Sequence, residues 1–186
     1  MTRWEPNARG RLEQAALDLF GERGFEQTTV EDIATRAGLT KRTFFRHYAD
    51  KREVLFGAGA EFQQVFVDSL ASAPQSATPL EAVAISLQAG GEMLEGRRQF
   101  ARRRQRVIAA NAELRERELV KLASVAAALT EGLHARGVAE PAASLAAETA
   151  MAVFRVAFER WLAEGETRSL PEIVRESVDA LRAVAA

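Results

Sequence analysis

The sequence predicts an all-α protein of about nine helices, and three observations carry that prediction. No stretch of the 186 residues alternates apolar and polar side chains in the way that a half-buried strand does. Apolar residues instead recur every three or four positions over most of the chain. All five prolines stand where such a period begins or breaks, which is where proline costs a helix least.

The first predicted helix spans about 6–23, and Gly24 ends it because glycine readily adopts the left-handed backbone found at helix ends. Thr29 and Asp32 then have the spacing of an N-terminal capping box, although aspartate is weaker than glutamate at the second position. They predict a short second helix, which ends at residues 37–38.

A third short helix is predicted over 41–47, after a threonine that can cap it. Asp50 can cap a longer fourth helix over about 51–73, in which Gly57 and Gly59 are unfavourable. These glycines indicate either close packing between helices or a locally loose turn. The remaining predicted helices span about 80–95, 97–110, 112–136, 141–163 and 171–184.

Composition and missing motifs exclude several classes of protein. The chain has no cysteine and only two histidines, so disulfides, thiolate sites and a multi-histidine metal site are not expected. It has no G-x-S-x-G, P-loop or G-x-G-x-x-G motif, so we do not expect an enzyme. No apolar run could span a membrane, and residues 1–9 lack the apolar core of a signal peptide. We therefore expect a cytoplasmic protein without a membrane partner.

A helix-turn-helix is predicted where residues 37–40 join the second and third helices. The third helix would project side chains that suit a DNA major groove, namely Lys41, Arg42, Thr43, Arg46 and His47. Residues 1–52 also carry ten Lys and Arg against eight Asp and Glu, whereas the rest of the chain carries fifteen against eighteen. Two ordinary surface helices with a basic turn, or a module that binds an acidic protein, remain alternatives on these observations alone.

Three runs in this region together resemble the tetracycline-repressor (TetR/AcrR) family of transcriptional regulators: Gly24–Ile33, Ala37–Thr40 and Thr43–Lys51. The motif covers about residues 24–54, and the nine-helix pattern extends the likeness over the chain. Tyr48 departs from the family, which more often has phenylalanine there, and its hydroxyl is expected to leave the fold untouched.

The resemblance implies a bacterial DNA-binding repressor that acts as a homodimer on a double-stranded palindromic operator and is released by a small-molecule effector. It implies a helix-turn-helix DNA-binding domain over 1–52 and a helical regulatory, ligand-binding and dimerisation domain over 53–186. It implies no cofactor besides the effector.

The family pattern assigns DNA contacts to single residues. Thr29 would meet a phosphate at a helix N-terminus, and Lys41, Arg42 and Thr43 fall at base-reading positions. Phe45 stands where the family usually has tyrosine. It loses a hydroxyl contact there but can pack on a sugar or a thymine methyl.

Further contacts to the DNA backbone are implied for Arg46, His47 and Lys51. Arg3 and Arg9 would form a basic arm before the first helix. For Arg46 and Lys51 the alternative is solvated surface charge, and for His47 it is helix packing.

The helix over 141–163 is apolar nearly all round, which predicts burial on more than one side. The resemblance implies that this helix and the one over 171–184 pair with their copies in a four-helix bundle. The alternative is that the first of them is central within one subunit. The expected interface residues are Phe154, Phe158, Trp161, Leu162, Ile173, Val174, Val178 and Leu181.

The resemblance also implies a small-molecule pocket among the fourth to eighth helices. Its candidate residues are Phe62, Phe66, Phe100, Arg104, Val107, Leu122, Val125, Met151 and Phe154. Ordinary core packing is the alternative for each apolar residue in this set.

Six arginines crowd residues 97–106, and a helical wheel puts Arg97 and Arg104 inside an apolar arc. The other four fall outside it, as solvated or DNA-facing charge. A charge on an apolar face needs a partner. Two explanations stay open: an internal ion pair, for example with Glu92, Glu148 or Glu159, or contact with an anionic group of the effector. Residues 102–162 are similar to the C-terminal domain of mycofactocin-type regulators, which implies a fatty acyl-CoA-like effector whose phosphates meet arginines.

Overall fold

The structure is a computed structural model that describes residues 7–185. Within that range the chain forms nine α-helices and one 3-10 turn without any strand, which confirms the all-α prediction. Arg3 and the expected helix start at residue 6 lie outside the described residues. The chain divides into two compact units, which are described separately below.

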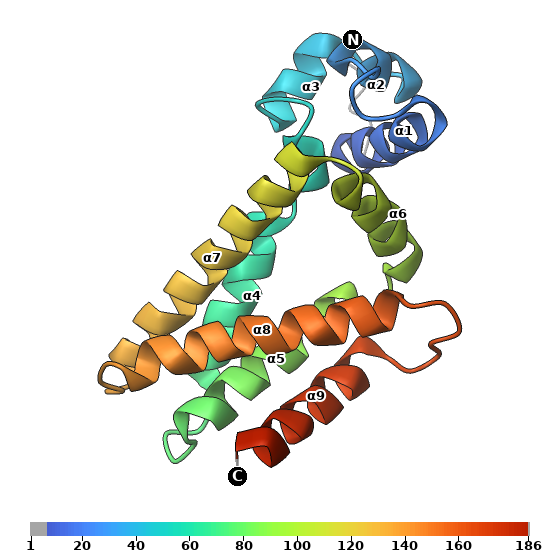
Figure 1. The fold of residues 1–186 in the computed structure, drawn as a ribbon. Coiled ribbons are helices and arrows are strands. Elements are labelled where there is room, and N and C mark those ends of the chain that lie inside the picture. The colour runs from blue at the N-terminus through green and yellow to red at the C-terminus, as the bar shows by residue number, and fades with distance from the viewer. Residues whose placement is uncertain (1–6, 186) are drawn as a thin grey trace. The chain divides into compact units, whose positions relative to one another are not determined.

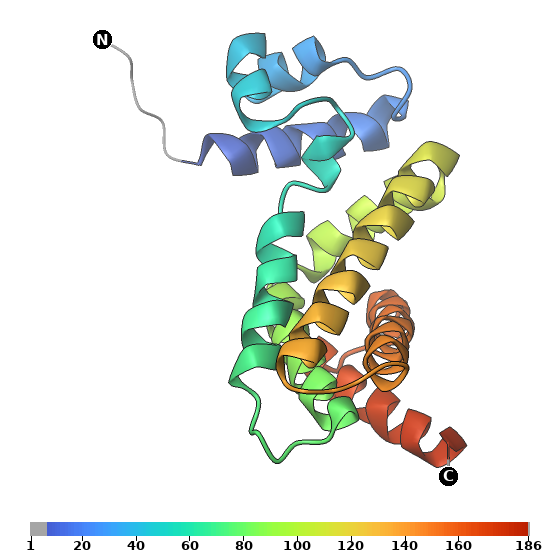
Figure 2. The same ribbon diagram turned by 90° about the vertical axis from the view of Figure 1, so that its left-hand side faces the viewer.

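The first unit contains the described residues up to Gly57 together with residues 102–118. Its elements are α1 (Ala8–Arg23), α2 (Val30–Arg36), α3 (Lys41–His47), the 3-10 turn η1 (Glu53–Leu55), most of α6 (Arg98–Ala109) and the start of α7 (Ala112–Ala135). Helix α1 packs against α2 and η1, and α2 packs against α3, as Figure 2 shows with α1 in dark blue. The core of this unit includes the completely buried side chains of Leu12, Ile33, Phe44, Ile108 and Leu114.

Two of those core residues come from α6 and α7, far along the chain from the first three helices. Both α6 and α7 therefore contribute residues to each unit. The boundary after residue 52 that the sequence suggests stays a prediction.

The predicted fourth helix begins at Gly59 and not at residue 51. Asp50 does act as a cap, but its carboxylate accepts from two backbone N–H groups (2.8 and 3.1 Å) that lead into η1. Gly57 then passes so close to the ring of Tyr48 that an added Cβ would lie 2.7 Å from it. The prediction of a continuous helix from residue 51 is wrong. These hydrogen bonds and this close approach determine the backbone before Gly59, although the apolar residues there recur at helical spacing. The other predicted helix ends agree to within about two residues.

The second unit contains α4 (Gly59–Ser72), α5 (Pro79–Glu95), α8 (Ala142–Leu162), α9 (Leu170–Ala185), the first turn of α6 and most of α7. Helix α5 lies against α4, α8 and α9, and α8 lies against α9 (Figure 1). Its core contains a row of aromatic rings whose neighbouring centroids are 4.7–6.1 Å apart: Phe62, Phe66, Phe154, Phe158 and Trp161. No helix of the described range is long and apolar enough to cross a membrane.

We expect Gly90→Ala in α5 to lower the free energy of unfolding of the second unit by about 1–3 kcal/mol. An added Cβ would lie 2.3 Å from the ring of Phe66, which is completely buried and has no room to move aside. Gly59→Ala is the matched control, because nothing lies within 4 Å of its Cβ position, and it should add about 0.4–1 kcal/mol. Urea unfolding measures both variants, and equal stabilities would contradict the packing argument.

Candidate DNA-binding surface

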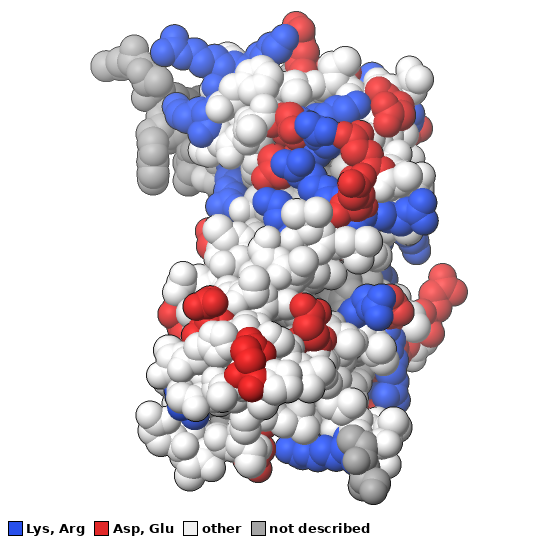
Figure 3. All heavy atoms as spheres, turned by 60° about the vertical axis from the view of Figure 1, so that its left-hand side comes forward, with Lys and Arg blue, Asp and Glu red and all other residues white. Residues whose placement is uncertain are grey.

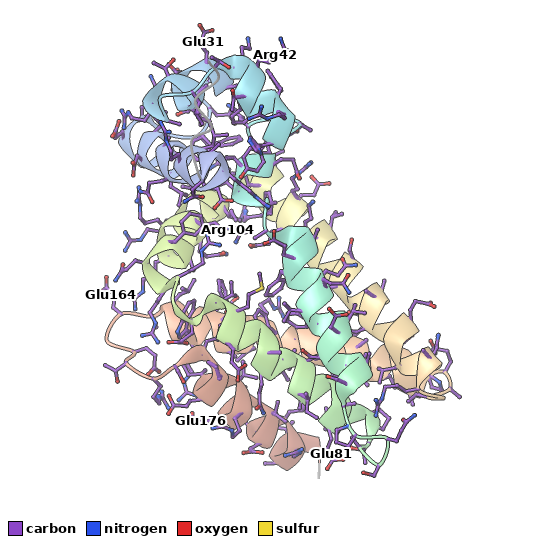
Figure 4. All side chains as sticks on the ribbon, turned by 180° about the vertical axis from the view of Figure 1, so that it is seen from behind. Glu31, Arg42, Glu81, Arg104, Glu164 and Glu176 are labelled. Carbon is purple, nitrogen blue, oxygen red and sulfur yellow. The ribbon has the colours of Figure 1, made fainter. Side chains whose placement is uncertain are left out.

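Helix α3 has one buried and one exposed side, and Phe44 defines the buried one. Phe44 is completely buried, and Tyr48, four residues on, is 4% exposed. Thr43 is half-buried beside them. The side chains that remain exposed are Lys41, Arg42, Phe45, Arg46 and His47. Figure 4 shows Arg42 projecting away from the outer end of the unit. Five of the eight predicted DNA-contacting side chains are therefore exposed on this one helix.

Thr40 fixes the start of α3, as the sequence predicts. Its hydroxyl oxygen accepts from the backbone N–H of Thr43 at 3.1 Å and lies 3.0 Å from the Thr43 hydroxyl. The Thr43 hydroxyl already has a partner in Thr40, so a base contact by Thr43 stays a prediction.

Thr29 and Asp32 form the predicted capping box at the start of α2. The Asp32 N–H donates to the Thr29 hydroxyl (3.1 Å), and the Thr29 N–H donates to the Asp32 carboxylate (2.9 Å). Hydrogen bonds from Thr29 hold the pKa of Asp32 below its usual range, so this helix end carries an ionised carboxylate. A phosphate contact by the exposed Thr29 stays a prediction.

The turn between α2 and α3 depends on Gly38, whose φ of 66° lies in the left-handed region. The Leu39 N–H closes the turn by donating to the Ala34 carbonyl at 2.8 Å. The Arg11 guanidinium of α1 donates to the Ala37 carbonyl and so connects the turn to α1. Sequence reasoning missed Arg11, because a residue on another helix leaves no mark in the local pattern.

Lys51 is placed differently from the other predicted contacts. Its ammonium donates to the carbonyls of Phe25 (2.9 Å), Thr28 (3.3 Å) and Glu26 (3.4 Å). It also lies 4.3 Å from the centroid of the Phe25 ring, within the range of a cation–π contact. The ammonium therefore holds the loop between α1 and α2, and its contact with a DNA backbone stays a prediction.

The Tyr48 hydroxyl has a partner that the sequence did not predict. It donates to the Glu13 carboxylate at 3.0 Å, and both side chains are buried. Burial raises the pKa of Tyr48, which keeps the hydroxyl a donor. Arg9 lies 3.5 Å from the same carboxylate and donates to the Gly57 carbonyl. The hydroxyl leaves the fold untouched, as expected, and adds a buried hydrogen bond to it. The expectation that Arg9 precedes the first helix is wrong, because Arg9 lies within α1 and its guanidinium contacts Glu13 and Gly57.

Charged contacts fasten residues 102–118 to the earlier part of the first unit, and we call them the α6–α7 latch. The latch joins Arg103 to Asp18, Arg52 to Glu113, Arg117 to Glu53, and Arg104 to Glu118 and the Leu55 carbonyl. Figure 3 shows basic and acidic side chains interleaved over one face of this unit. The more exposed pairs of Arg52, Arg103 and Arg117 are each worth little alone, whereas the pair of Arg104 and Glu118 is largely buried. Periodicity could not find it, because most of the partners lie far apart in the sequence.

Arg104 is the least exposed arginine of the latch, at 19% of its side chain. Its Nε donates to the Leu55 carbonyl (2.7 Å), its Nη1 donates to Glu118 (2.9 Å), and its guanidinium stacks on the Phe56 ring at 5.0 Å. Burial lowers the pKa of Arg104, and the Glu118 carboxylate opposes that shift. Internal pairing is therefore present, but with Glu118 and not with any of the three glutamates considered from the sequence.

The helical wheel misplaced two arginines at the start of the run. Helix α6 begins at Arg98, and Arg97 immediately precedes it, with its carbonyl accepting from the Ala101 N–H at 2.9 Å. Arg97 is exposed, with its guanidinium 4.5 Å from the centroid of the Phe100 ring. Arg98, expected in solvent, donates to the Glu166 carbonyl at 2.6 Å and stacks on Trp161 at 5.1 Å. Arg98 thus packs within the second unit.

Most of the expected dimer-interface residues lie in the core of the second unit. Buried there are Phe154, Trp161, Ile173, Val174 and Val178, with Phe158, Leu162 and Leu181 half-buried against them. A second copy could not reach the buried side chains without rearrangement. The large apolar side chains that α8 leaves exposed are Leu145 and Val156, which are 63% and 55% exposed. The homodimer stays a prediction, and its contacts would come from outward-facing residues such as these.

The expected pocket residues are divided between the units. Arg104 and Val107 belong to the first unit, and Phe62, Phe66, Phe100, Leu122, Val125, Met151 and Phe154 belong to the second. Within the second unit, Phe66, Val125, Met151 and Phe154 are buried in the core, which agrees with the packing alternative. A role in ligand binding stays a prediction for the whole set.

Comparison with known proteins gives matches over both halves of the chain. Residues 13–58 match the family model "Bacterial regulatory proteins, tetR family", and residues 77–186 match the model of the MftR C-terminal domain. A Mycobacterium tuberculosis protein described as a mycofactocin biosynthesis transcriptional regulator, MftR, is 28% identical over 178 residues, 92% of this chain and 88% of that protein. The transcriptional regulator TcmR of Streptomyces glaucescens is 38% identical over 81 residues, 44% of this chain but only 36% of TcmR.

A solved structure shares the fold. FadR from Bacillus subtilis, solved in complex with stearoyl-CoA, superposes with a TM-score of 0.60 over 92% of this chain and 96% of its own. The two sequences are 22% identical, so the likeness concerns the fold alone.

We expect Glu118→Ala to lower the free energy of unfolding by about 2–3 kcal/mol, because it leaves the Arg104 guanidinium without its counter-charge in a largely buried site. The double variant Arg104→Met with Glu118→Leu should cost less than the single change, since no unpaired charge remains. Urea unfolding measures the free energy of unfolding of the parent chain, the single variant and the double variant. A Glu118→Ala variant as stable as the parent chain would show that the pair does not hold this segment.

Proposed function

The chain belongs to the TetR family of bacterial regulatory proteins, with a C-terminal domain of the MftR type, and we propose that it is an effector-released repressor. The family consists of transcriptional regulators and not of enzymes. In this proposal the protein acts in the cytoplasm as a homodimer on a palindromic operator.

The observation that carries the proposal is the exposed face of α3. Lys41 and Arg42 stand exposed at its N-terminal end, above the completely buried Phe44. Arginine and lysine can donate to the O6 and N7 atoms of guanine, which are presented in the major groove. Phosphate contacts from neighbouring residues would position the helix, while these base contacts would specify the sequence.

A homodimer is proposed because one short helix reaches few base pairs. Two copies double the base contacts and match the two halves of a palindrome, with half-sites about one helical turn or more apart. The exposed Leu145 and Val156 on α8 support this proposal, since they offer apolar area that a second copy can bury.

A fatty acyl-CoA-like effector is proposed from two considerations. FadR from Bacillus subtilis, one of the solved regulators that share this fold, was solved in complex with stearoyl-CoA. The half-buried Phe62 and Phe158 of the aromatic row would supply apolar surface for an acyl chain.

The experiment that tests the proposal is selection of binding sites from random duplex DNA by the purified chain. Recovery of a palindrome is expected, with an affinity that falls steeply as salt rises, because phosphate binding releases counterions. Recovery of no sequence, at low salt and without added ligand, would overturn operator binding by the chain alone. An acidic protein partner would not discriminate between duplex sequences, so selection also separates that alternative.

We expect Arg42→Ala to relax specificity at one position of each half-site, where discrimination against the wrong base should fall by about 1–3 kcal/mol. Arg115→Ala is the matched control, because Arg115 is another exposed arginine of the first unit and lies on α7. Binding measured on operators with single base changes distinguishes the two. An equal loss on every sequence for Arg42→Ala would remove Arg42 from the base-reading residues.

A further inference from the structure

Trp161 on α8 carries a buried hydrogen-bond donor that has no acceptor. Its side chain is completely buried in the core of the second unit. Among the described residues of this unit, its indole Nε1 is the one buried side-chain nitrogen or oxygen without a hydrogen-bond partner. A donor that leaves water and gains no acceptor destabilises the fold that buries it. The unpaired indole therefore needs an explanation.

Another buried donor of the same unit shows the usual arrangement. Ser86 on α5 is completely buried, and its hydroxyl donates to the Phe66 carbonyl at 2.9 Å. Nearly all buried polar groups in proteins are paired in this way, and the exceptions include groups with a functional role. The contrast with Ser86 indicates that the acceptor for Trp161 comes from outside the chain.

The groups that hold the indole cannot supply this acceptor. The Arg98 guanidinium lies over the ring at 5.1 Å, and the Phe158 ring lies 5.8 Å away at an interplanar angle of 41°. A guanidinium has donors only, and a phenylalanine ring has neither donor nor acceptor groups. Arg98 is itself fixed by donating to the Glu166 carbonyl at 2.6 Å. These contacts position the indole and leave its N–H unpaired.

The surroundings limit the kind of ligand that can bring an acceptor. Trp161 ends the aromatic row, so an acceptor that reaches it must be attached to an apolar body. Phe158 is half-buried, which makes its side of the row the one that solvent reaches. An acyl group fits both conditions, because its carbonyl oxygen accepts hydrogen bonds and its chain is hydrocarbon. An acyl thioester and a free fatty acid share this chemistry.

We propose that the Trp161 indole N–H donates a hydrogen bond to the acyl carbonyl oxygen of the effector. The inference rests on the proposed function and deepens it by naming the atom that recognises the effector. It makes Trp161 the residue that distinguishes an acyl compound from a hydrocarbon chain of the same length. Trp161 then acts within one chain, whereas the family resemblance had suggested it for the dimer interface.

The test compares stearoyl-CoA with its thioether analogue, in which a methylene group replaces the carbonyl. The purified chain should bind the thioester about tenfold more tightly. Trp161→Phe keeps an aromatic ring without the N–H, and it should bind the two compounds about equally. Ser86→Ala is the matched control, because it removes a buried donor that is already paired within the unit. It should keep the preference for the thioester.

A second measurement uses the intact indole and does not depend on how Trp161→Phe folds. The chain has two tryptophans, so its proton NMR spectrum contains two indole N–H signals, which Trp4→Phe assigns. The Trp161 signal should move downfield with stearoyl-CoA and not with the thioether. Stearate separates the two sources of the carbonyl. A shift with stearate and not with stearoyl-CoA would support the hydrogen bond with a fatty acid as its partner.

Three outcomes overturn the inference. They are equal affinity of the parent chain for thioester and thioether, a preference for the thioester that persists in Trp161→Phe, and a Trp161 signal that neither acyl compound moves. Failure of the proposed function would appear separately, as selection that recovers no operator or as an operator that neither acyl compound releases.

Discussion

Complete burial of Phe44 sets the rotation of α3 about its own axis. A helix of seven residues has little stability by itself, so its orientation depends on what it packs against. The Phe44 ring lies 5.6 Å from that of Tyr48, whose hydroxyl is bonded to Glu13 of α1. One aromatic contact and one buried hydrogen bond therefore connect the exposed arc of α3 to the first helix. The polar and charged side chains of α3 reach solvent because Phe44 and Tyr48 hold the opposite side of the helix in the core.

Features governed by neighbours in the sequence were predictable. The capping box of Thr29 and Asp32 and the cap at Thr40 each depend on residues a few positions apart, and the structure contains both. The exposed residues of α3 are also predictable from the helical period, because burial of Phe44 determines which side chains face solvent. The family resemblance then supplied what they bind, which spacing alone left open.

Features governed by distant residues were not predictable. Helix α4 starts late because of a close approach between Gly57 and Tyr48, and Arg104 pairs with a glutamate on the following helix. The helical wheel put Arg97 inside an apolar arc and Arg98 outside it, whereas Arg97 is exposed and Arg98 lies against Trp161 of α8. Apolar periodicity reports which face is buried but not which segment buries it. The same limit explains why residues expected at a dimer interface lie in the core of one chain.

The α6–α7 latch has a consequence for exchanging parts between regulators. The first unit is not one continuous stretch, because it includes residues 102–118. A chimera that moved only the residues up to Gly57 onto another body would separate Arg52 and Glu53 from Glu113 and Arg117. Grafting a few outward side chains onto α3 would leave those pairs and the buried Phe44 in place. A change of DNA specificity should therefore be made by substituting exposed side chains of α3 and not by exchanging the N-terminal segment.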